Sequence, residues 1–225
     1  MSEGGARAVG VGAAMVLVLA VVAAFVIRAG LTGTGPGAAD GAVLDWFLAH
    51  RSAGWTAVAV VVTNVGSTLA MAAVAVVVGI ALWLRGRRAD AVFLVGVMAV
   101  ASAVFRLLKM SFDRPRPPAI DRLVNETNES MPSGHATMSV AVIGALVAVF
   151  WAGRTVVARV AMVAAAALWV LAVGVTRMYL GVHWFSDVLA GWFVGAAVLA
   201  VACTLRARWR HRATPHPAAT AADAS

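Results

Sequence analysis

The sequence predicts an all-α membrane protein whose helices form a bundle, and three observations lead to this. Of its 225 residues, 62% are hydrophobic and 12% are charged, and the mean hydropathy is +0.89. Soluble domains are roughly half apolar and about a quarter charged, and disordered chains are poor in hydrophobic residues. Hydrophobic runs of about 20 residues, the length that crosses a bilayer, recur along the chain. The single cysteine, Cys203, excludes a disulfide-stapled secreted protein and a zinc site built from several cysteines.

The first hydrophobic run extends from Ala8 to Ile27 and ends at Arg28. The hydrophobic part of a signal peptide is only about 7 to 15 residues long, so we interpret this longer run as a retained membrane span. A loop rich in Gly, Pro and Ala is expected from Gly30 to Ala42. The segment from Val43 to Arg51 is expected to lie at the membrane interface.

The next run, from Ser52 to Leu84, carries no charge for 33 residues. As one helix it would be about 50 Å long, whereas the hydrocarbon core is about 30 Å thick. Division at Asn64-Val65-Gly66-Ser67 leaves only 12 residues on the first side, too few for a second crossing. We therefore expect a partly embedded outer helix from Ser52 to Thr63, followed by a span from Gly66 to Leu84.

Four more hydrophobic runs follow: Ala91 to Leu108, Ala136 to Ala152, Val156 to Thr176 and Trp184 to Leu205. The expected fold is thus a bundle of six transmembrane helices plus the partly embedded outer helix. Residues 1–212 would form the membrane domain, and residues 213–225 a disordered cytoplasmic tail. In the last span, Gly191 and Gly195 have the spacing of a helix-packing motif, which we expect to act within the bundle.

Basic residues predict the orientation, because cytoplasmic loops are enriched in Lys and Arg. The net charge of +8 is therefore interpreted as a topology signal and not as a nucleic-acid surface. With six spans and both termini in the cytoplasm, ten of the 18 basic residues lie on that side: Arg7, Arg85, Arg87, Arg88, Arg154, Arg159, Arg206, Arg208, Arg210 and Arg212. A seventh crossing would turn most of these residues outward. The segments 109–135 and 178–183 are then extracytoplasmic in a multi-pass cell-membrane protein.

Pro132-Ser133-Gly134-His135 stands in the first of these outer segments, where the fourth span begins. Ser is a favoured helix cap, and the free N–H groups of a first helical turn attract anions, above all phosphate. A helix cap beside an interfacial histidine is the simpler explanation of this motif taken alone.

His183 and Asp187 are four residues apart at the start of the sixth span and therefore share one helical face. A carboxylate this close to the hydrocarbon is costly and indicates a functional site with a partner. By binding one ring nitrogen, Asp187 would fix the tautomer of His183 and leave the other nitrogen free as a nucleophile or base. An ion pair at the headgroups is the alternative interpretation.

Three cations from the outer segments complete the pattern: Lys109, which is the only lysine, Arg116 and Arg177. A guanidinium suits phosphate oxygens, and the lysine adds a compact charge. Three cations would oppose a divalent metal ion, so we expect an anion site that needs no metal and no cofactor. Basic residues at helix ends also extend to lipid headgroups, and five are assigned to that role: Arg28, Arg51, Arg106, Arg114 and Arg122. Glu126 is interpreted as part of a polar loop.

Together these residues resemble the signature of the type 2 phosphatidic acid phosphatase family, the lipid phosphate phosphatases, which shares its site with vanadium haloperoxidases. That signature has Lys and, after six residues, Arg-Pro; then Pro-Ser-Gly-His; then Ser-Arg, five residues, His, three residues and Asp. This chain carries Lys109 with Arg116-Pro117, the motif at 132–135, and Thr176-Arg177 with His183 and Asp187. Thr176 replaces the usual serine and keeps the hydroxyl.

The resemblance implies a metal-independent hydrolase of a phosphate or diphosphate monoester. His183 would attack phosphorus, Asp187 would orient its ring, and His135 would protonate the leaving group and then activate water. The oxygens of the phosphate would be held by Lys109, Arg116, Ser133, Gly134 and Arg177.

The expected substrate is a lipid phosphate met at the outer headgroup level, among membrane lipids. Undecaprenyl or another polyprenyl diphosphate, phosphatidic acid, phosphatidylglycerol phosphate and diacylglycerol diphosphate all remain candidates, and the oligomeric state stays open. A phosphotransferase, or a lipid transporter or flippase with the same anionic-headgroup pocket, is the alternative. The haloperoxidases are soluble, so the hydrophobic spans argue against their activity here.

Overall fold

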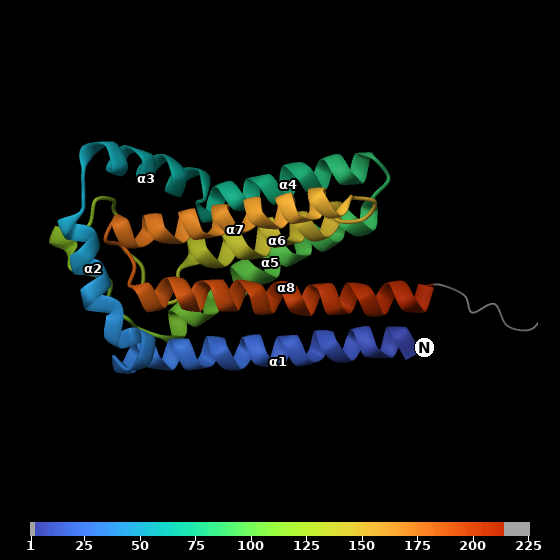
Figure 1. Ribbon diagram of the computed structural model, residues 1–225, viewed down its shortest axis with the longest axis horizontal. Coiled ribbons are helices and arrows are strands. Elements are labelled where there is room, and N and C mark those ends of the chain that lie inside the picture. Colours follow the sequence, from blue (N-terminus) through green and yellow to red (C-terminus); the bar gives the residue numbers. More distant parts are fainter. Residues whose placement is uncertain (1–2, 214–225) are drawn as a thin grey trace, which may run out of the picture.

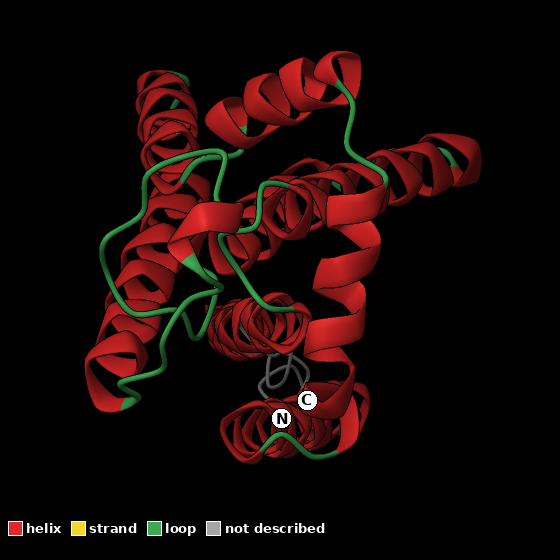
Figure 2. Cartoon of the chain, turned by 90° about the vertical axis from the view of Figure 1, so that its left-hand side faces the viewer, coloured by secondary structure: helices red, strands yellow, loops and turns green. Residues whose placement is uncertain are grey.

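The computed structural model describes residues 3–213, which are helices and loops without a strand (Figure 2). Ten helical elements follow one another: α1 (Glu3–Thr32), η1 (Gly35–Ala39), α2 (Asp40–Ala49), α3 (Ala53–Val65), α4 (Thr68–Leu84), α5 (Arg88–Ser111), η2 (Ala119–Asp121), α6 (Gly134–Phe150), α7 (Val156–Tyr179) and α8 (Phe185–Ala213). The expected all-α bundle is confirmed. Apart from residue 213, the predicted disordered tail lies outside the described residues.

The number of candidate spans is smaller than the six expected. Four stretches are long and apolar enough to cross a membrane: Val9–Thr32, Arg88–Ser111, Val156–Tyr179 and Phe185–Arg210. Helices α3 and α4 pass the same test only as a pair bent by 45°. Helix α6 has 17 residues and falls short. It packs against α4, α5, α7 and α8, and a helix surrounded by protein needs no long lipid-facing surface.

Local sequence signals set most helix boundaries. Ser52 caps the start of α3 and Ser67 caps the start of α4, each accepting a hydrogen bond from a backbone N–H of the first turn. The break between α3 and α4 therefore falls at Gly66-Ser67, where it was expected. The predicted loop from Gly30 to Ala42 is wrong: α1 continues to Thr32, and η1 and α2 occupy most of the remainder. Nothing stops α1 before Gly33, whose φ of +65° suits the end of a helix.

Glycines bring α6 and α8 unusually close, as the spacing in the last span predicted. A Cβ atom on Gly191 would lie 2.7 Å from the Ser133 carbonyl oxygen, and one on Gly195 would lie 2.5 Å from the Thr137 carbonyl oxygen. Any larger residue would push the two backbones apart. The Ser133 N–H also donates to the Asp187 carbonyl oxygen at 3.0 Å. The two helices thus hold the Pro-Ser-Gly-His motif beside Asp187.

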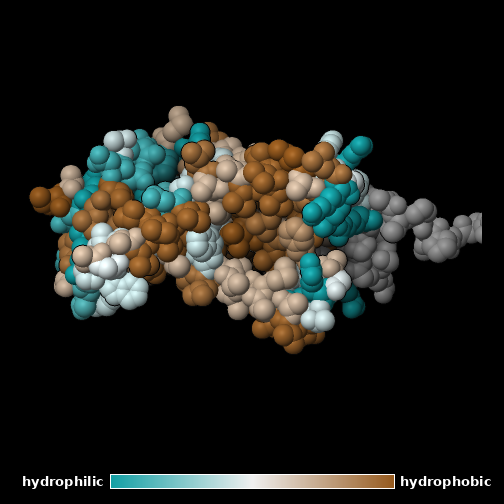
Figure 3. All heavy atoms as spheres, turned by 90° about the horizontal axis from the view of Figure 1, so that it is seen from above, coloured by the Kyte–Doolittle hydropathy of each residue, from teal (hydrophilic) through white to brown (hydrophobic). Residues whose placement is uncertain are grey.

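The two ends of the bundle differ in the segments that form them. The starts of α1 and α5 and the end of α8 lie at one end (Figure 1), where Asp90 forms ion pairs with Arg87, Arg206 and Arg210. At the other end α2 crosses the helix ends beside the long loop between α5 and α6 (Figures 1 and 2). Hydrophobic residues gather over the middle of the molecule and hydrophilic ones toward both ends (Figure 3).

Candidate active site

The three motifs meet at the end of the bundle that α2 crosses. Lys109 comes from the last turn of α5, Arg177 from the last turn of α7, and Asp187 from the first turn of α8. Arg116 and His183 come from the connecting loops. The exposed fractions of these five residues run from 0 to 8%, so none of them extends to lipid headgroups. Ser133 and Gly134 are buried beside them, and His135 is partly buried.

His183 is held at both ring nitrogens. Its Nδ1 lies 3.3 Å from Asp187 Oδ2, and its Nε2 lies 3.2 Å from Arg116 Nη1. A guanidinium only donates hydrogen bonds, so Nε2 is the acceptor and the ring proton is on Nδ1, facing the carboxylate. Burial and the charges of Arg116, Arg177 and Lys109 lower the pKa of His183 well below its usual value. The ring is therefore neutral, with its lone pair directed at the cations.

This lowered pKa predicts how stability depends on pH. Below about pH 6.5 the unfolded chain binds a proton at this histidine and the folded chain does not, so the free energy of unfolding falls as the pH decreases. At higher pH both states are neutral and the effect vanishes. Melting temperatures measured in detergent between about pH 7 and pH 5 should therefore decline less steeply for His183→Gln than for the parent. Equal slopes would contradict the prediction.

Asp187 is surrounded by donors that the sequence motifs do not include. Its Oδ2 accepts from the Ser130 hydroxyl and from the Trp184 N–H at 2.9 Å. Its Oδ1 accepts from Arg114, a residue assigned above to lipid headgroups. Arg114 also pairs with Asp40 of α2 at 2.6 Å. Asp40 lies in the segment predicted to be a loop, and the sequence expectations did not single it out. The cost of an acidic residue in an otherwise apolar stretch is the one signal that could have found it.

The headgroup assignment is wrong for two further arginines. Arg51 donates from Nη2 to the Asp121 and Tyr179 carbonyl oxygens, both at 2.8 Å. Arg122 donates from Nε to the Pro117 carbonyl oxygen at 2.8 Å. Both side chains tie together the loops that surround the site, and backbone carbonyl groups take the place of lipid phosphates.

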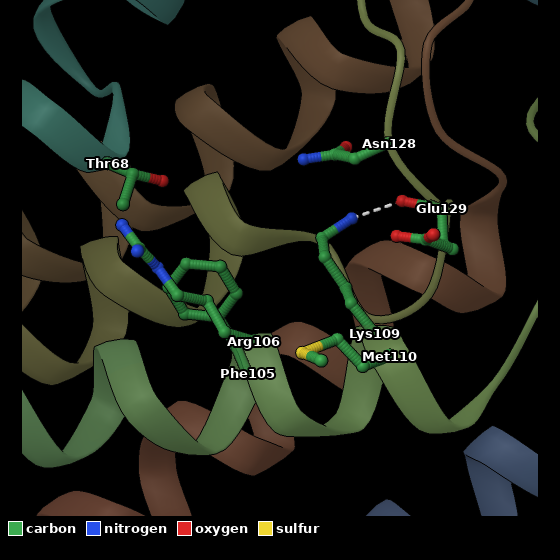
Figure 4. Close-up of a pocket in the computed structure, with 7 residues that line it drawn as sticks. All are labelled: Thr68, Phe105, Arg106, Lys109, Met110, Asn128 and Glu129. Carbon is green, nitrogen blue, oxygen red and sulfur yellow. Dashed lines mark hydrogen bonds between the residues drawn. The ribbon is translucent and has the colours of Figure 1, made fainter.

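The three predicted phosphate-binding cations are fixed by backbone and side-chain acceptors. Lys109 donates to the Glu129 carbonyl oxygen (Figure 4) and to the Ser130 carbonyl oxygen at 3.3 Å. Arg116 donates to the Asn128 side chain at 2.6 Å and to the Val182 carbonyl oxygen at 2.5 Å, and burial lowers its pKa.

Arg177 is held differently from the other two cations. It donates to Thr63 Oγ1 at 2.7 Å from Nη1, while its buried Nε has no hydrogen-bond partner among residues 3–213. That free N–H leaves one edge of the guanidinium available for an anion.

A carboxylate lies between two of these cations. Glu126 forms an ion pair with Arg177, and its second oxygen is 3.7 Å from Arg116 Nη2. The expected polar loop therefore carries a negative charge into the group of cations. Nothing in the local sequence marks this glutamate, because the contact depends on how the loop folds back over α7.

A pocket of about 400 Å³ opens beside Lys109 between α4, α5 and the long loop (Figure 4). Arg106, one helical turn before Lys109 on α5, lines the same pocket. Besides these two cations, its wall contains apolar, polar and acidic residues: Phe105, Met110, Thr68, Asn128 and Glu129. Such a mixed wall suits a ligand that has both an anionic and an apolar part.

Comparisons with known proteins agree with the motifs. Residues 90–211, more than half of the chain, match the model of the PAP2 superfamily. Phosphatidylglycerophosphatase B of Bacillus subtilis (strain 168) is 28% identical over 138 residues, or 60% of this chain. The match spans 66% of that relative, just under two thirds of its length.

Two crystal structures share the fold. A transmembrane PAP2-type phosphatidylglycerolphosphate phosphatase from Bacillus subtilis aligns with a TM-score of 0.75 and 22% identity, covering 85% of this chain and 96% of its own. Aquifex aeolicus LpxE aligns with a TM-score of 0.60 and 20% identity, covering 73% and 94%. The architecture is that of a multi-pass membrane protein, and the chain belongs to the PAP2 superfamily.

Proposed function

We propose that this chain hydrolyses a phosphate or diphosphate monoester of a lipid through a phosphohistidine on His183. One observation carries the proposal: the buried, neutral ring of His183 directs its Nε2 lone pair toward Arg116 while Asp187 holds Nδ1. A nucleophile whose base form is fixed beside cations matches attack on an anionic phosphate. The phosphatase domain comprises residues 1–212.

The reaction has two steps. Nε2 of His183 forms a bond to phosphorus as the bond from phosphorus to the leaving oxygen breaks, and His135 gives a proton to that oxygen. His135 then takes a proton from water, which attacks phosphorus and releases inorganic phosphate and free His183. Asp187 stabilises the positive charge that the ring carries between the steps.

The phosphate oxygens are held throughout both steps. Lys109, Arg116 and Arg177 supply the positive charge, and the Ser133 hydroxyl and the Gly134 N–H at the start of α6 add neutral donors. The residues of this chain complete the reaction without a metal ion.

The pocket beside Lys109 supports a lipid as the carrier of the phosphate, because apolar Phe105 and Met110 share its wall with Arg106. The names of the Bacillus subtilis relatives make phosphatidylglycerol phosphate the first substrate to test. Phosphatidic acid and polyprenyl diphosphates such as undecaprenyl diphosphate follow. The test is release of inorganic phosphate by the purified chain from each lipid, with and without orthovanadate. No release from any of them would overturn the proposal, and movement of intact lipid between leaflets would favour a transporter.

The topology we propose has six crossings, with both termini in the cytoplasm and the site outside. Two observations support this topology. The starts of α1 and α5 and the end of α8 lie at the same end of the bundle (Figure 1), and arginines are concentrated at that end. In this arrangement α6 crosses inside the bundle, and α3 with α4 makes one bent crossing.

Labelling of a single cysteine tests the orientation. With Cys203 replaced by serine and Asn125 by cysteine, an impermeant thiol reagent is expected to modify the protein in intact cells. The matched control places the cysteine at Arg85, at the opposite end, where labelling should require broken cells. The reverse pattern would place the site in the cytoplasm.

Glu126 is expected to compete with the substrate phosphate for Arg177 and Arg116. Glu126→Gln removes that carboxylate charge, so binding of inorganic phosphate or orthovanadate should tighten by about two- to fivefold, the worth of a partly exposed ion pair. Inhibition constants measure this, with Asp113→Asn in the exposed part of the same loop as control. Unchanged or weaker inhibition would show that the carboxylate does not compete.

A further inference from the structure

We propose that Asp40 and Arg114 form a positioning pair that sets the Asp187 carboxylate, and through it the His183 ring, for attack. The inference rests on the proposed function, because it assigns the pair a part in that reaction. Neither residue belongs to the three motifs, and Asp40 precedes the matched residues 90–211 altogether. The N-terminal part of the chain would then complete the site.

Arg114 bridges two buried carboxylates. Its Nη2 lies 2.6 Å from Asp40 Oδ2, and its Nη1 donates to Asp187 Oδ1. The exposed fractions of the three side chains are 10% for Arg114, 7% for Asp40 and 0% for Asp187. The guanidinium meets the two carboxylates from two separate nitrogens held in one plane, a geometry that the compact ammonium of a lysine does not reproduce.

Asp40 also fixes the start of α8. Its Oδ1 accepts from the Ser186 N–H at 2.8 Å, and its Oδ2 accepts from the Ser186 hydroxyl at 2.7 Å. The first N–H groups of a helix have no partner within the helix, so this side chain satisfies one of them. Arg114 Nη1 reaches the same hydroxyl at 2.9 Å. Asp40, Arg114 and Ser186 therefore form one network around the turn that carries Asp187.

The consequence concerns the rotation of the Asp187 carboxylate. Among residues 3–213, Arg114 is the only hydrogen-bond donor to Oδ1, whereas Oδ2 faces Ser130, the Trp184 N–H and His183. Holding Oδ1 keeps Oδ2 turned toward His183 Nδ1. Asp40 in turn holds the other side of the guanidinium. Its loss should misplace the ring without removing any group that touches phosphate.

The test uses Asp40→Asn in the purified full-length chain, with Asp45→Asn on the exposed face of α2 as matched control. Outer partners that orient metal-binding histidines contribute about 10- to 100-fold to affinity or activity, and by analogy we expect kcat on the lipid phosphate that the parent hydrolyses to fall by about that factor. KM should stay within about twofold, because substrate binding is not touched. Asp45→Asn should keep parental values.

Two measurements separate positioning from a purely structural role. Phosphoenzyme stoichiometry counts the competent sites, and a reduced kcat per competent site supports the proposal. If Asp40→Asn instead has fewer competent sites, and each of them keeps the parental kcat, the proposal is overturned. In the double variant with Arg114→Gln, Asp40→Asn should cost much less than it does in the parent; a small further loss is expected because Asp40 also binds Ser186 directly. Full additivity would also overturn the proposal.

Arg114→Lys is the second variant if Asp40→Asn does not fold, since it keeps the charge but loses the two coplanar nitrogens that contact Asp40 and Asp187 separately. The same loss of kcat is expected, and a parental kcat would contradict the proposal. Failure of the parent itself to hydrolyse any lipid phosphate would instead refute the proposed function.

Discussion

Replacing His183 with alanine is expected to abolish both lipid phosphate hydrolysis and the covalent phosphoenzyme. The loss should be on the order of 10⁶-fold in kcat, as when the nucleophile is removed from a serine protease. The reason is geometric: of the two ring nitrogens, only Nε2 directs a lone pair at the cations. Among residues 3–213, no other histidine forms a hydrogen bond with Arg116. Phosphate release and acid-labile radioactive phosphate on the protein are the two measurements.

His50→Ala is the matched control for this prediction. His50 follows α2 at the same end of the bundle, is exposed, and contacts the Trp46 carbonyl oxygen through Nδ1. It should keep parental activity and phosphoenzyme. Hydrolysis at the parental rate by purified His183→Ala would remove the nucleophile assignment and the phosphohistidine with it.

Asp187→Asn is expected to lower kcat by about 10⁴-fold, the loss seen when the orienting carboxylate of a catalytic triad becomes an amide. An amide keeps the shape but can present N–H to His183 Nδ1, which favours the wrong tautomer. It also leaves the buried Arg114 with one carboxylate partner instead of two. Binding contacts to phosphate are untouched, so KM should change little.

Single-turnover formation of the phosphoenzyme measures this effect directly, since that step uses the aligned nucleophile. Asp45→Asn again provides the control. A loss of kcat smaller than about tenfold would show that Asp187 does not govern the His183 tautomer, since a misoriented base costs far more.

Much of the fold follows from local sequence. The hydrophobic runs, the serines at 52, 67 and 133, and the break at Gly66 place most helices within a few residues of their observed ends. A helix is stabilised mainly by residues within one or two turns of each other, so a local pattern is enough to predict it. Helix α6 has the 17 residues of its predicted run, shifted by two positions. Hydrophobicity alone did not indicate that α6 is surrounded by protein, because it does not distinguish contact with lipid from contact with protein.

The candidate site, like the fold, was predicted from the sequence only in part. Fixed spacings in sequence predicted that Lys109, Arg116, His183 and Asp187 belong together, and they meet at one end of the bundle. Their roles in catalysis remain predictions. The Asp40 and Glu126 contacts had no comparable signal, since Asp40 is 74 residues from Arg114 and Glu126 is 51 residues from Arg177.

By itself the sequence determined the membrane character of this protein, its helices, and the set of residues that bears the family signature. Only the tertiary structure decided which neighbours hold those residues: Arg114 on Asp187, Asp40 on Arg114, and Glu126 between two cations. The physical reason is that buried charges must find partners wherever packing brings them. A partner can come from any part of the chain, and spacing along the sequence does not record it.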